Sequence, residues 1–305
     1  MSKFPQQVSI VEVGARDGLQ NETAVIELPV KLAFIDGLVR AGLKRIEAGS
    51  FVSPKWVPQM ADSAAVFNSL GQDSDATFSA LTPNEKGMLA AIDAGVDEVA
   101  VFAAASESFS QRNINCSIEQ SLERFQPVFR LARQHNLPVR GYVSCVMGCP
   151  YEGAISPDAV LAVSQTLLDK GCYEISLGDT IGTGTPGQTA QLLSTLLKTI
   201  PASKLAVHFH DTYGQALANI LVALQHGISV IDSAAGGLGG CPYAAGASGN
   251  VATEDVVYML NGMGIDCGVD INALVAASTQ IFDHLNREPA SRTMRALLAK
   301  HHNVI

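Results

Sequence analysis

His208 and His210 stand two residues apart at the end of an apolar stretch, just before an Asp-Thr-Tyr-Gly turn. Residues at this spacing on an extended strand point to the same face, so the two imidazoles should project together. Imidazole is a common metal ligand, and the pair favours a metal site over the alternative of hydrogen-bonded core histidines. The other five histidines lack this arrangement on a predicted strand and are interpreted as ordinary.

Other polar residues fall where predicted strands end. Arg16 and Asp17 follow the first strand, Glu47 ends the second, and Asp179 follows the sixth. In a parallel barrel these ends meet at one mouth, where active sites lie, so Asp17 can join the two histidines as a ligand. Each residue also has a structural alternative, because Asp17 and Asp179 could cap helices and Arg16 could pair with Glu47. Such a cluster of charge at one mouth favours a functional site.

The residue types also bear on which metal would bind. One carboxylate and two imidazoles, with oxygen donors completing the shell and no adjacent pair of thiolates, favour an octahedral site for Mg²⁺ or Mn²⁺. Zinc is the alternative. The sequence does not choose between Mg²⁺ and Mn²⁺.

Eight short β-branched runs alternate with longer segments of helical periodicity. The predicted strands are 8–13, 45–48, 76–81, 98–103, 138–145, 173–177, 205–209 and 230–234, and helices are predicted over 29–41, 85–94, 117–135, 157–170, 186–199 and 214–226. Eight such units predict a TIM (β/α)8 barrel with additional C-terminal helices. A doubly wound open sheet is the alternative, because strand count does not prove closure. With no linker, we expect one domain over residues 1–305, the barrel spanning about 6–265 and the helical extension about 266–305.

Composition narrows the function. The 305 residues are 47% hydrophobic and 16% charged, with a net charge of −9. The negative charge argues against a nucleic-acid partner, and no apolar run approaches a membrane span. Without a leader-like N-terminus we expect a cytoplasmic protein. Six cysteines in a chain of this size are expected to be reduced thiols.

Three further segments invite chemical interpretations. Gly182-Thr-Gly-Thr-Pro-Gly187 matches a dinucleotide fingerprint, but it lies at the sixth βα turn and lacks a ribose-binding acid, so a plain turn or a phosphate cradle is favoured. Cys145 and Cys149 lack the second pair that a zinc site needs. The long glycine-rich segment 236–250 suggests a functional loop, in which Cys241 could approach a bound substrate as an acid. A structural role suits Cys116 or Cys172 better.

The segments VEVGARDGLQNE (11–22), HFHDTYG (208–214) and GLGGCPYA (237–244) closely resemble those of the 3-hydroxy-3-methylglutaryl-CoA lyases, and the likeness covers nearly the whole chain. The resemblance implies that Mg²⁺ or Mn²⁺ is held by Asp17, His208, His210 and Asn250. It further implies that Arg16 contacts the thioester side and that Cys241 is the loop acid. Glu47 and Asp179 become supporting acidic residues, and Gln20 and Tyr142 become candidate substrate contacts.

The resemblance implies cleavage of (S)-3-hydroxy-3-methylglutaryl-CoA to acetyl-CoA and acetoacetate, as in leucine degradation. The C3 hydroxyl must lose its proton, to Asp17 or a metal-linked base, while Arg16 stabilises the enolate oxygen. Either Cys241 or His208 then protonates the enolate carbon.

Other functions remain open at this point. A lyase for a longer 3-hydroxy-3-alkylglutaryl-CoA, and a Claisen-condensing synthase of the 2-isopropylmalate or homocitrate type, share much of the pattern. The cysteine loop and the chain length argue against the synthase. A catalytically silent metal-binding barrel is a further alternative, which the full set of site residues disfavours. The resemblance also implies a homodimer or a higher homo-oligomer.

Overall fold

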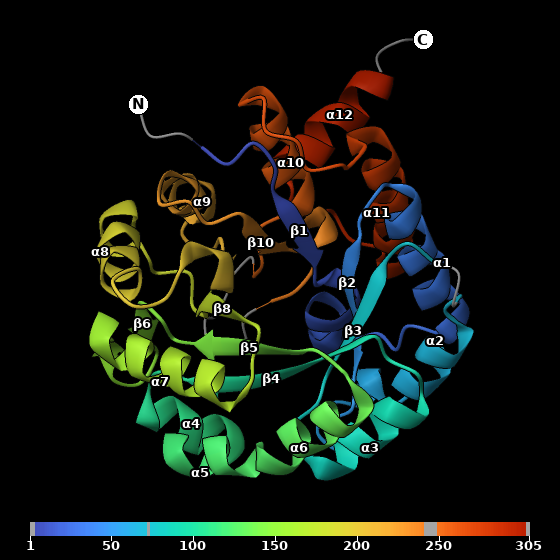
Figure 1. The fold of residues 1–305 in the computed structure, drawn as a ribbon. Helices are drawn as coiled ribbons and strands as arrows, with labels where there is room; N and C mark the ends of the chain where they lie inside the picture. The colour runs from blue at the N-terminus through green and yellow to red at the C-terminus, as the bar shows by residue number, and fades with distance from the viewer. Residues whose placement is uncertain (1–3, 72–73, 241–248, 303–305) are drawn as a thin grey trace.

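Eight parallel strands form a closed barrel in the computed structural model, which describes residues 4–71, 74–240 and 249–302 (Figure 1). Around the barrel their order is β1-β10-β9-β8-β5-β4-β3-β2. The strands are β1 (Ser9–Glu12), β2 (Arg45–Ser50), β3 (Thr77–Leu81), β4 (Glu98–Ala104), β5 (Val139–Ser144), β8 (Glu174–Asp179), β9 (Leu205–Phe209) and β10 (Val230–Ser233). The closed ring confirms the predicted TIM barrel, and the open-sheet alternative is wrong.

The predicted strands agree closely with the observed ones. β9 has the predicted bounds, and the other strands differ by no more than two residues at either end. β1 pairs with both β10 and β2, which closes the ring. A short hairpin, β6 (Gly148–Cys149) with β7 (Gly153–Ala154), follows β5 and lies outside the barrel sheet.

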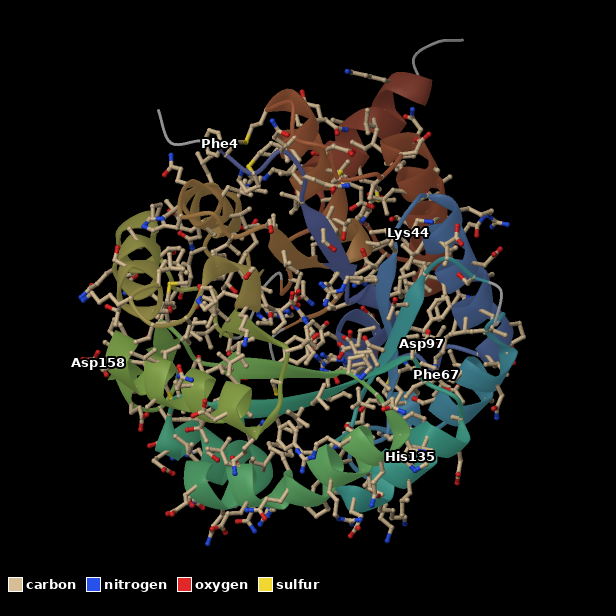
Figure 2. All side chains as sticks on the ribbon, in the orientation of Figure 1. Phe4, Lys44, Phe67, Asp97, His135 and Asp158 are labelled. Atoms are coloured by element: carbon tan, nitrogen blue, oxygen red, sulfur yellow. The ribbon has the colours of Figure 1, made fainter. Side chains whose placement is uncertain are left out.

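Helices cover the outside of the barrel between successive strands (Figure 1). They are α1 (Leu28–Arg40), α2 (Ser63–Ser69), α3 (Glu85–Asp93), α4 (Glu107–Ile114), α5 (Ile118–Arg124), α6 (Gln126–His135), α7 (Pro157–Lys170), α8 (Pro186–Leu196), α9 (Ala216–Gln225) and α10 (Thr253–Gly262). Their apolar faces pack on the strands, as Phe67 of α2 does, whereas Lys44 and Asp158 are exposed (Figure 2).

The single helix predicted over 117–135 is wrong, because the chain breaks there into α5 and α6 at Phe125. Pro127 lies in the first turn of α6. Proline has no backbone N–H, and its ring collides with the carbonyl four residues earlier, so a proline inside a helix kinks or breaks it. The break is therefore a local consequence of one residue that the periodicity did not weigh.

The C-terminal segment forms the predicted additional helices, α11 (Ile271–Leu285) and α12 (Arg292–His302). α11 packs against α1, where a Cβ on Gly37 would lie 2.8 Å from the Cβ of Ala277. Glycine at position 37 thus permits the close approach of the two helices. That the whole chain is one domain stays a prediction. Among the described residues, no helix is both long and apolar enough to cross a membrane.

Candidate active site

Asp17, His208 and His210 form one donor cluster at the carboxyl ends of β1 and β9. One ligand atom from each residue lies within 4.8 Å of the others. His208 Nε2 lies 4.0 Å from Asp17 Oδ2, and the two imidazole centroids are 5.4 Å apart. Both histidines are 8% exposed. The structure thus brings together three of the four predicted ligands as donors to a possible metal.

Asp17 follows β1, as predicted, and sits on a tight turn. Residues Gly14–Gly18 form one turn of π-helix, closed by a hydrogen bond from Gly18 N to Val13 O at 3.1 Å. The turn packs closely, because a Cβ on Gly18 would lie 2.7 Å from the Cβ of Leu238. Such π turns are frequent at functional sites, where they aim a side chain.

Asp17 accepts hydrogen bonds on both carboxylate oxygens. Oδ1 accepts from Arg16 Nη1 at 2.6 Å and from Gln20 Nε2 at 3.0 Å, and Oδ2 accepts from Asn250 Nδ2 at 2.9 Å. Burial disfavours the charged form, but Arg16, the two histidines and Asn250 together lower the pKa of Asp17 to about 2. The carboxylate is therefore ionised at neutral pH and fixed in direction.

Arg16 is held between two acids. Its Nε donates to Glu47 Oε2 at 2.5 Å, its Nη2 forms an ion pair with the same oxygen, and its Nη1 binds Asp17. Glu47 lies on β2 and is fully buried. Burial raises the pKa of Glu47 despite the neighbouring guanidinium. The ion pair considered as a structural alternative for Arg16 exists, and it also orients the guanidinium toward Asp17.

His208 contacts a residue that the sequence analysis missed, Asp232 on β10. His208 Nδ1 lies 3.3 Å from Asp232 Oδ2, and the two residues are partners in the β9–β10 register. Although burial disfavours a charged ring, this contact raises the pKa of His208. The Tyr142 ring packs edge-on against the imidazole, with the centroids 6.0 Å apart. Tyr142 is 8% exposed, and its predicted contact with substrate stays a prediction.

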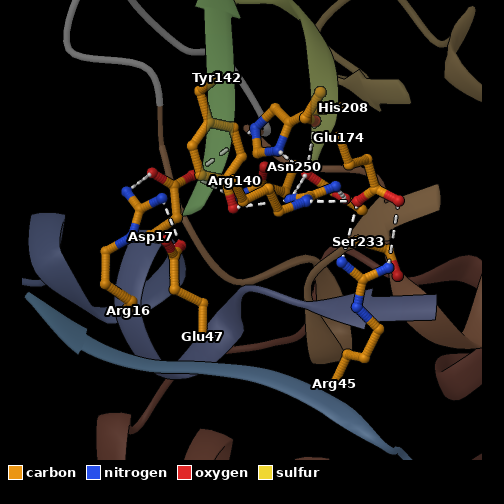
Figure 3. A network of polar contacts seen from close by, with 12 residues as sticks. Arg16, Asp17, Arg45, Glu47, Arg140, Tyr142, Glu174, His208, Ser233 and Asn250 are labelled. Carbon is orange, nitrogen blue, oxygen red and sulfur yellow. Dashed lines mark hydrogen bonds and ion pairs between the residues drawn. The ribbon is translucent and has the colours of Figure 1, made fainter. Parts of the chain in front are cut away.

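Further charged side chains lie in the barrel interior near the amino ends of the strands (Figure 3). Arg140 binds Asp232 through both terminal nitrogens, at 3.0 and 2.7 Å, and Glu174 through Nε at 2.7 Å. Arg45 also binds Glu174, at 2.9 Å. The sequence does carry a signal for Arg140 and Asp232, because each is a charged residue within an otherwise apolar barrel strand. Their cross-barrel pairing could not be read from neighbouring residues.

His210, like Glu47 and Asp179, keeps a buried polar atom without a hydrogen-bond partner in the described part of the chain. Its Nδ1 is buried, and no hydrogen-bond partner is found for it among residues 4–71, 74–240 and 249–302. Burial and the neighbouring His208 lower the pKa of His210 to about 4, so the ring is neutral at pH 7. A neutral imidazole beside an ionised carboxylate is the form in which these residues bind a divalent metal. The donor set therefore fits such an ion.

Asn250, the fourth predicted ligand, lies beside the cluster in a bridge with His210. Its Nδ2 donates to Asp17 and, at 3.3 Å, to Leu238 O. The amide nitrogen is committed to the protein, so Asn250 could reach a metal only through Oδ1. Its role as a ligand stays a prediction.

Asp179 ends β8 and organises the turn that follows. Its Oδ2 accepts from Gly184 N at 2.8 Å, and its backbone O accepts from Gly182 N at 3.0 Å. Burial raises the pKa of Asp179 to about 6. Two amides of the glycine-rich turn, Gly182 N and Gly184 N, are bound by oxygens of Asp179 itself, which supports a plain turn over a phosphate cradle. A supporting role for Asp179 agrees with this geometry.

The predicted loop acid, Cys241, lies outside the described residues. The described chain on either side of it returns to the site. Gly240 O accepts from Asn21 Nδ2 at 3.1 Å, and Asp211 N donates to Gly249 O at 2.8 Å. The five described cysteines are free thiols, as expected, and all but Cys267 are buried.

Comparisons with known proteins agree with this geometry. The family model described as HMGL-like matches residues 7–281. The chain is 59% identical over 293 residues to "Hydroxymethylglutaryl-CoA lyase, mitochondrial" of Gallus gallus, covering 96% of this chain and 98% of the relative. It is also 59% identical over 297 residues to "3-hydroxy-3-isohexenylglutaryl-CoA/hydroxy-methylglutaryl-CoA lyase" of Pseudomonas aeruginosa, covering 97% and 99%. The crystal structure of hydroxymethylglutaryl-CoA lyase from Pseudomonas aeruginosa matches with a TM-score of 0.96 and 59% identity, over 97% of this chain and 99% of that one.

Proposed function

Because this chain belongs to the HMGL-like family, we propose that it is a divalent-metal-dependent lyase that cleaves 3-hydroxy-3-methylglutaryl-CoA to acetyl-CoA and acetoacetate. This reaction is a step of leucine degradation. The observation that carries the proposal is the cluster of Asp17, His208 and His210 beside the fixed guanidinium of Arg16. The active sites of such barrels lie at this end of the strands.

The metal site would use Asp17, His208 and His210, with Asn250 completing it through Oδ1. A bound Mg²⁺ or Mn²⁺ ion supplies Lewis-acid charge that favours loss of the C3 hydroxyl proton. Asp17 accepts bonds on both oxygens, so we assign it to ligation and to holding Arg16 rather than to proton transfer. The C3 hydroxyl proton would then pass to a metal-linked base, the other acceptor that the sequence suggests.

Arg16 would stabilise the charge that develops on the thioester oxygen when the carbon–carbon bond breaks. Its guanidinium is fixed by Glu47 on one side and Asp17 on the other. A donor held in place before the reaction does not have to reorganise when charge appears, which is why preorganised donors lower barriers. Glu47 would act through Arg16 and is therefore a positioning residue.

The enolate of acetyl-CoA must finally accept a proton at carbon. Both nitrogens of His208 have other tasks, since Nδ1 faces Asp232 and Nε2 faces the donor cluster. We therefore assign this step to Cys241 rather than to His208. The thiol has no competing assignment in the proposed mechanism.

The proposal is tested by incubating the protein with 3-hydroxy-3-methylglutaryl-CoA and either Mg²⁺ or Mn²⁺. We expect acetoacetate and acetyl-CoA in equal amounts, and no product after treatment with EDTA. Adding back each ion separately identifies the one that supports turnover. Absence of product with every divalent ion tested would reject the lyase function.

A second candidate is a lyase for a longer 3-hydroxy-3-alkylglutaryl-CoA. The Pseudomonas aeruginosa relative carries the isohexenyl substrate in its name, at 59% identity. The kcat/KM values for the methyl and isohexenyl substrates, measured on the same preparation, distinguish the two. The condensing-synthase alternative predicts instead the release of CoA from acetyl-CoA and a 2-oxo acid, and the lyase names of the relatives disfavour it.

Two further properties are part of the proposal. We expect a homodimer or higher homo-oligomer, which light scattering of the purified protein tests. We also expect a cytoplasmic location. Relatives with cytoplasmic and with mitochondrial names both exist, so fractionation of the source cells decides it.

A further inference from the structure

We propose that Asp232 is a positioning residue for the metal ligand His208. Its carboxylate accepts the Nδ1 proton of His208 and thereby presents the unprotonated Nε2 to the metal. The inference rests on the metal site of the proposed function. It concerns a residue on β10, the strand next to β1, and this residue faces the other ring nitrogen of His208 from the one that faces Asp17.

The geometry between the two residues is set by the barrel itself. Asp232 on β10 and His208 on β9 are register partners on adjacent parallel strands. Asp232 is 2% exposed, and its Oδ2 lies 3.3 Å from His208 Nδ1. On the far side of the ring, Nε2 lies 4.0 Å from Asp17 Oδ2. The imidazole therefore spans the space between the buried carboxylate and the donor cluster.

Asp232 can only accept in this position. Arg140 donates to both of its oxygens, from Nη2 to Oδ1 at 2.7 Å and from Nη1 to Oδ2 at 3.0 Å. Ser176 Oγ donates to Oδ2 at 2.7 Å. A carboxylate surrounded by donors offers His208 only an acceptor, so the ring must place its proton on Nδ1. In a neutral imidazole the other nitrogen then carries the lone pair that a metal needs.

Ring packing fixes the orientation from a second direction. The Tyr142 ring lies edge-on to His208 with the centroids 6.0 Å apart, and Tyr142 OH accepts from Arg140 Nη1 at 3.0 Å. Arg140 thus binds both the carboxylate of Asp232 and the hydroxyl of Tyr142, the two groups that contact His208. Figure 3 shows Arg140, Tyr142 and His208 side by side. Partners of this kind, which orient metal-bound histidines, typically contribute 10- to 100-fold to metal affinity or activity.

The network offers a matched control in Glu174. Glu174 is buried, binds the same Arg140 through Nε at 2.7 Å and also binds Arg45, but no contact between it and His208 is found in the described chain. Glu174→Gln and Asp232→Asn each replace one buried carboxylate of the network by its amide. Only Asp232→Asn changes the group that faces the imidazole.

Asp232→Asn removes the charge and leaves one oxygen and one NH₂ group to meet the donors of Arg140 and Ser176. The group that faces His208 is then either an NH₂, which favours a proton on Nε2, or a neutral oxygen, which holds the Nδ1 proton less strongly than a carboxylate does. Mn²⁺ titration of the metal-free protein by calorimetry should therefore show an affinity about 10- to 100-fold weaker for this variant. Glu174→Gln should retain the wild-type affinity even if its melting temperature falls. Equal Mn²⁺ affinity of wild type and Asp232→Asn would overturn the inference.

A second measurement does not depend on how well the variant folds. Nitrogen-15 NMR of the metal-free wild-type protein, with the His208 signals assigned by their loss in His208→Gln, should show the proton on Nδ1. A proton on Nε2 would overturn the inference.

The proposed function can fail separately from this inference. A protein that binds Mn²⁺ as described but does not cleave 3-hydroxy-3-methylglutaryl-CoA rejects only the lyase proposal. A wild-type protein that binds no divalent ion rejects both.

Discussion

Asp17 has a divided role among its neighbours. One oxygen binds Arg16 and Gln20, and the other binds Asn250 and faces His208. The residue therefore connects the cation that would stabilise the enolate with the donors that would hold the metal. A change at Asp17 would disturb both, so cleaner tests of the separate tasks lie at His210 and Cys241.

His210→Ala should weaken the binding of Mn²⁺, because it removes the neutral imidazole whose Nδ1 lacks a partner among the described residues. We expect a loss at least as large as the 10- to 100-fold typical of removing a supporting partner. Calorimetric titration measures it. His135→Ala, at an exposed position on α6, serves as the control. An unchanged titration for His210→Ala would remove this residue from the ligand set.

Cys241→Ala should lower kcat by about 10²- to 10⁴-fold, the contribution typical of a general acid, while Mn²⁺ affinity stays at the wild-type value. The separation of the two readouts distinguishes a lost acid from a damaged metal site. The matched control is Cys267→Ala, which removes a half-buried thiol from the segment between α10 and α11. A Cys241→Ala protein with near-normal turnover would exclude the thiol from the mechanism.

At the scale of elements, two short turns that follow the neighbouring strands β1 and β10 contact each other beside the site. One is the π turn Gly14–Gly18, and the other is the 3₁₀ turn Ala235–Gly237 after β10. Gly236 has φ +61°, and a Cβ there would lie 2.0 Å from Phe282 of α11. Glycine at position 236 therefore allows α11 to pack directly on the turn.

Gly236→Ala should therefore lower the free energy of unfolding by more than backbone strain alone. Overpacking typically costs about 1–3 kcal/mol, in addition to the cost of the left-handed backbone conformation. Gly95→Ala is the matched control, since Gly95 has φ +72° but no atom within 4 Å of the added methyl. That variant should show only the strain, about 1–2 kcal/mol. Urea unfolding of both compares them, and equal losses would contradict the assigned role of Phe282.

At the scale of the whole molecule, buried acids tie separate parts of the chain together. Glu12 on β1 accepts from Gly14 N at 2.8 Å, Ala235 N at 2.9 Å and Thr253 Oγ1 at 2.6 Å. It thus joins both turns to the start of α10. Burial raises the pKa of Glu12 to about 8, and burial also raises the pKa of Glu254 to about 7.

These raised pKa values predict that stability falls as pH increases. The folded protein keeps the Glu12 proton up to about pH 8, whereas the unfolded chain releases it near pH 4.5. The stabilisation is complete below the unfolded pKa and is lost as the pH rises toward the folded one. One such group gives a slope of at most about 1.4 kcal/mol per pH unit.

Glu12→Gln should therefore flatten the decline in the free energy of unfolding between pH 5 and pH 8, leaving the part due to other buried acids such as Glu254 and Asp179. Urea unfolding at several pH values measures the slope. Glu119→Gln, at an exposed site on α5, should leave the slope as in the wild type. A slope in Glu12→Gln equal to that of the wild type would show that Glu12 is not the titrating group.

The sequence by itself determined what depends on neighbouring residues. The period of two that puts His208 and His210 on one face is a property of any strand, and β9 has the predicted bounds. The alternation of strands and helices is equally local, and with it came the barrel and the carboxyl ends where Arg16, Asp17 and Glu47 gather. The break at Pro127 was also readable from one residue, although the periodicity hid it.

Only the tertiary structure decided which distant residues meet. Arg140 and Asp232 are 92 residues apart in sequence, and Asp17 and Asn250 are 233 apart, yet each pair is hydrogen-bonded. Their contact depends on closure of the barrel and on the register of its strands, to which every strand contributes. The same closure turned Asp232, an interruption in an apolar strand, into the partner of His208. Local periodicity indicates which face a side chain takes, but the packing of the whole ring selects its partner.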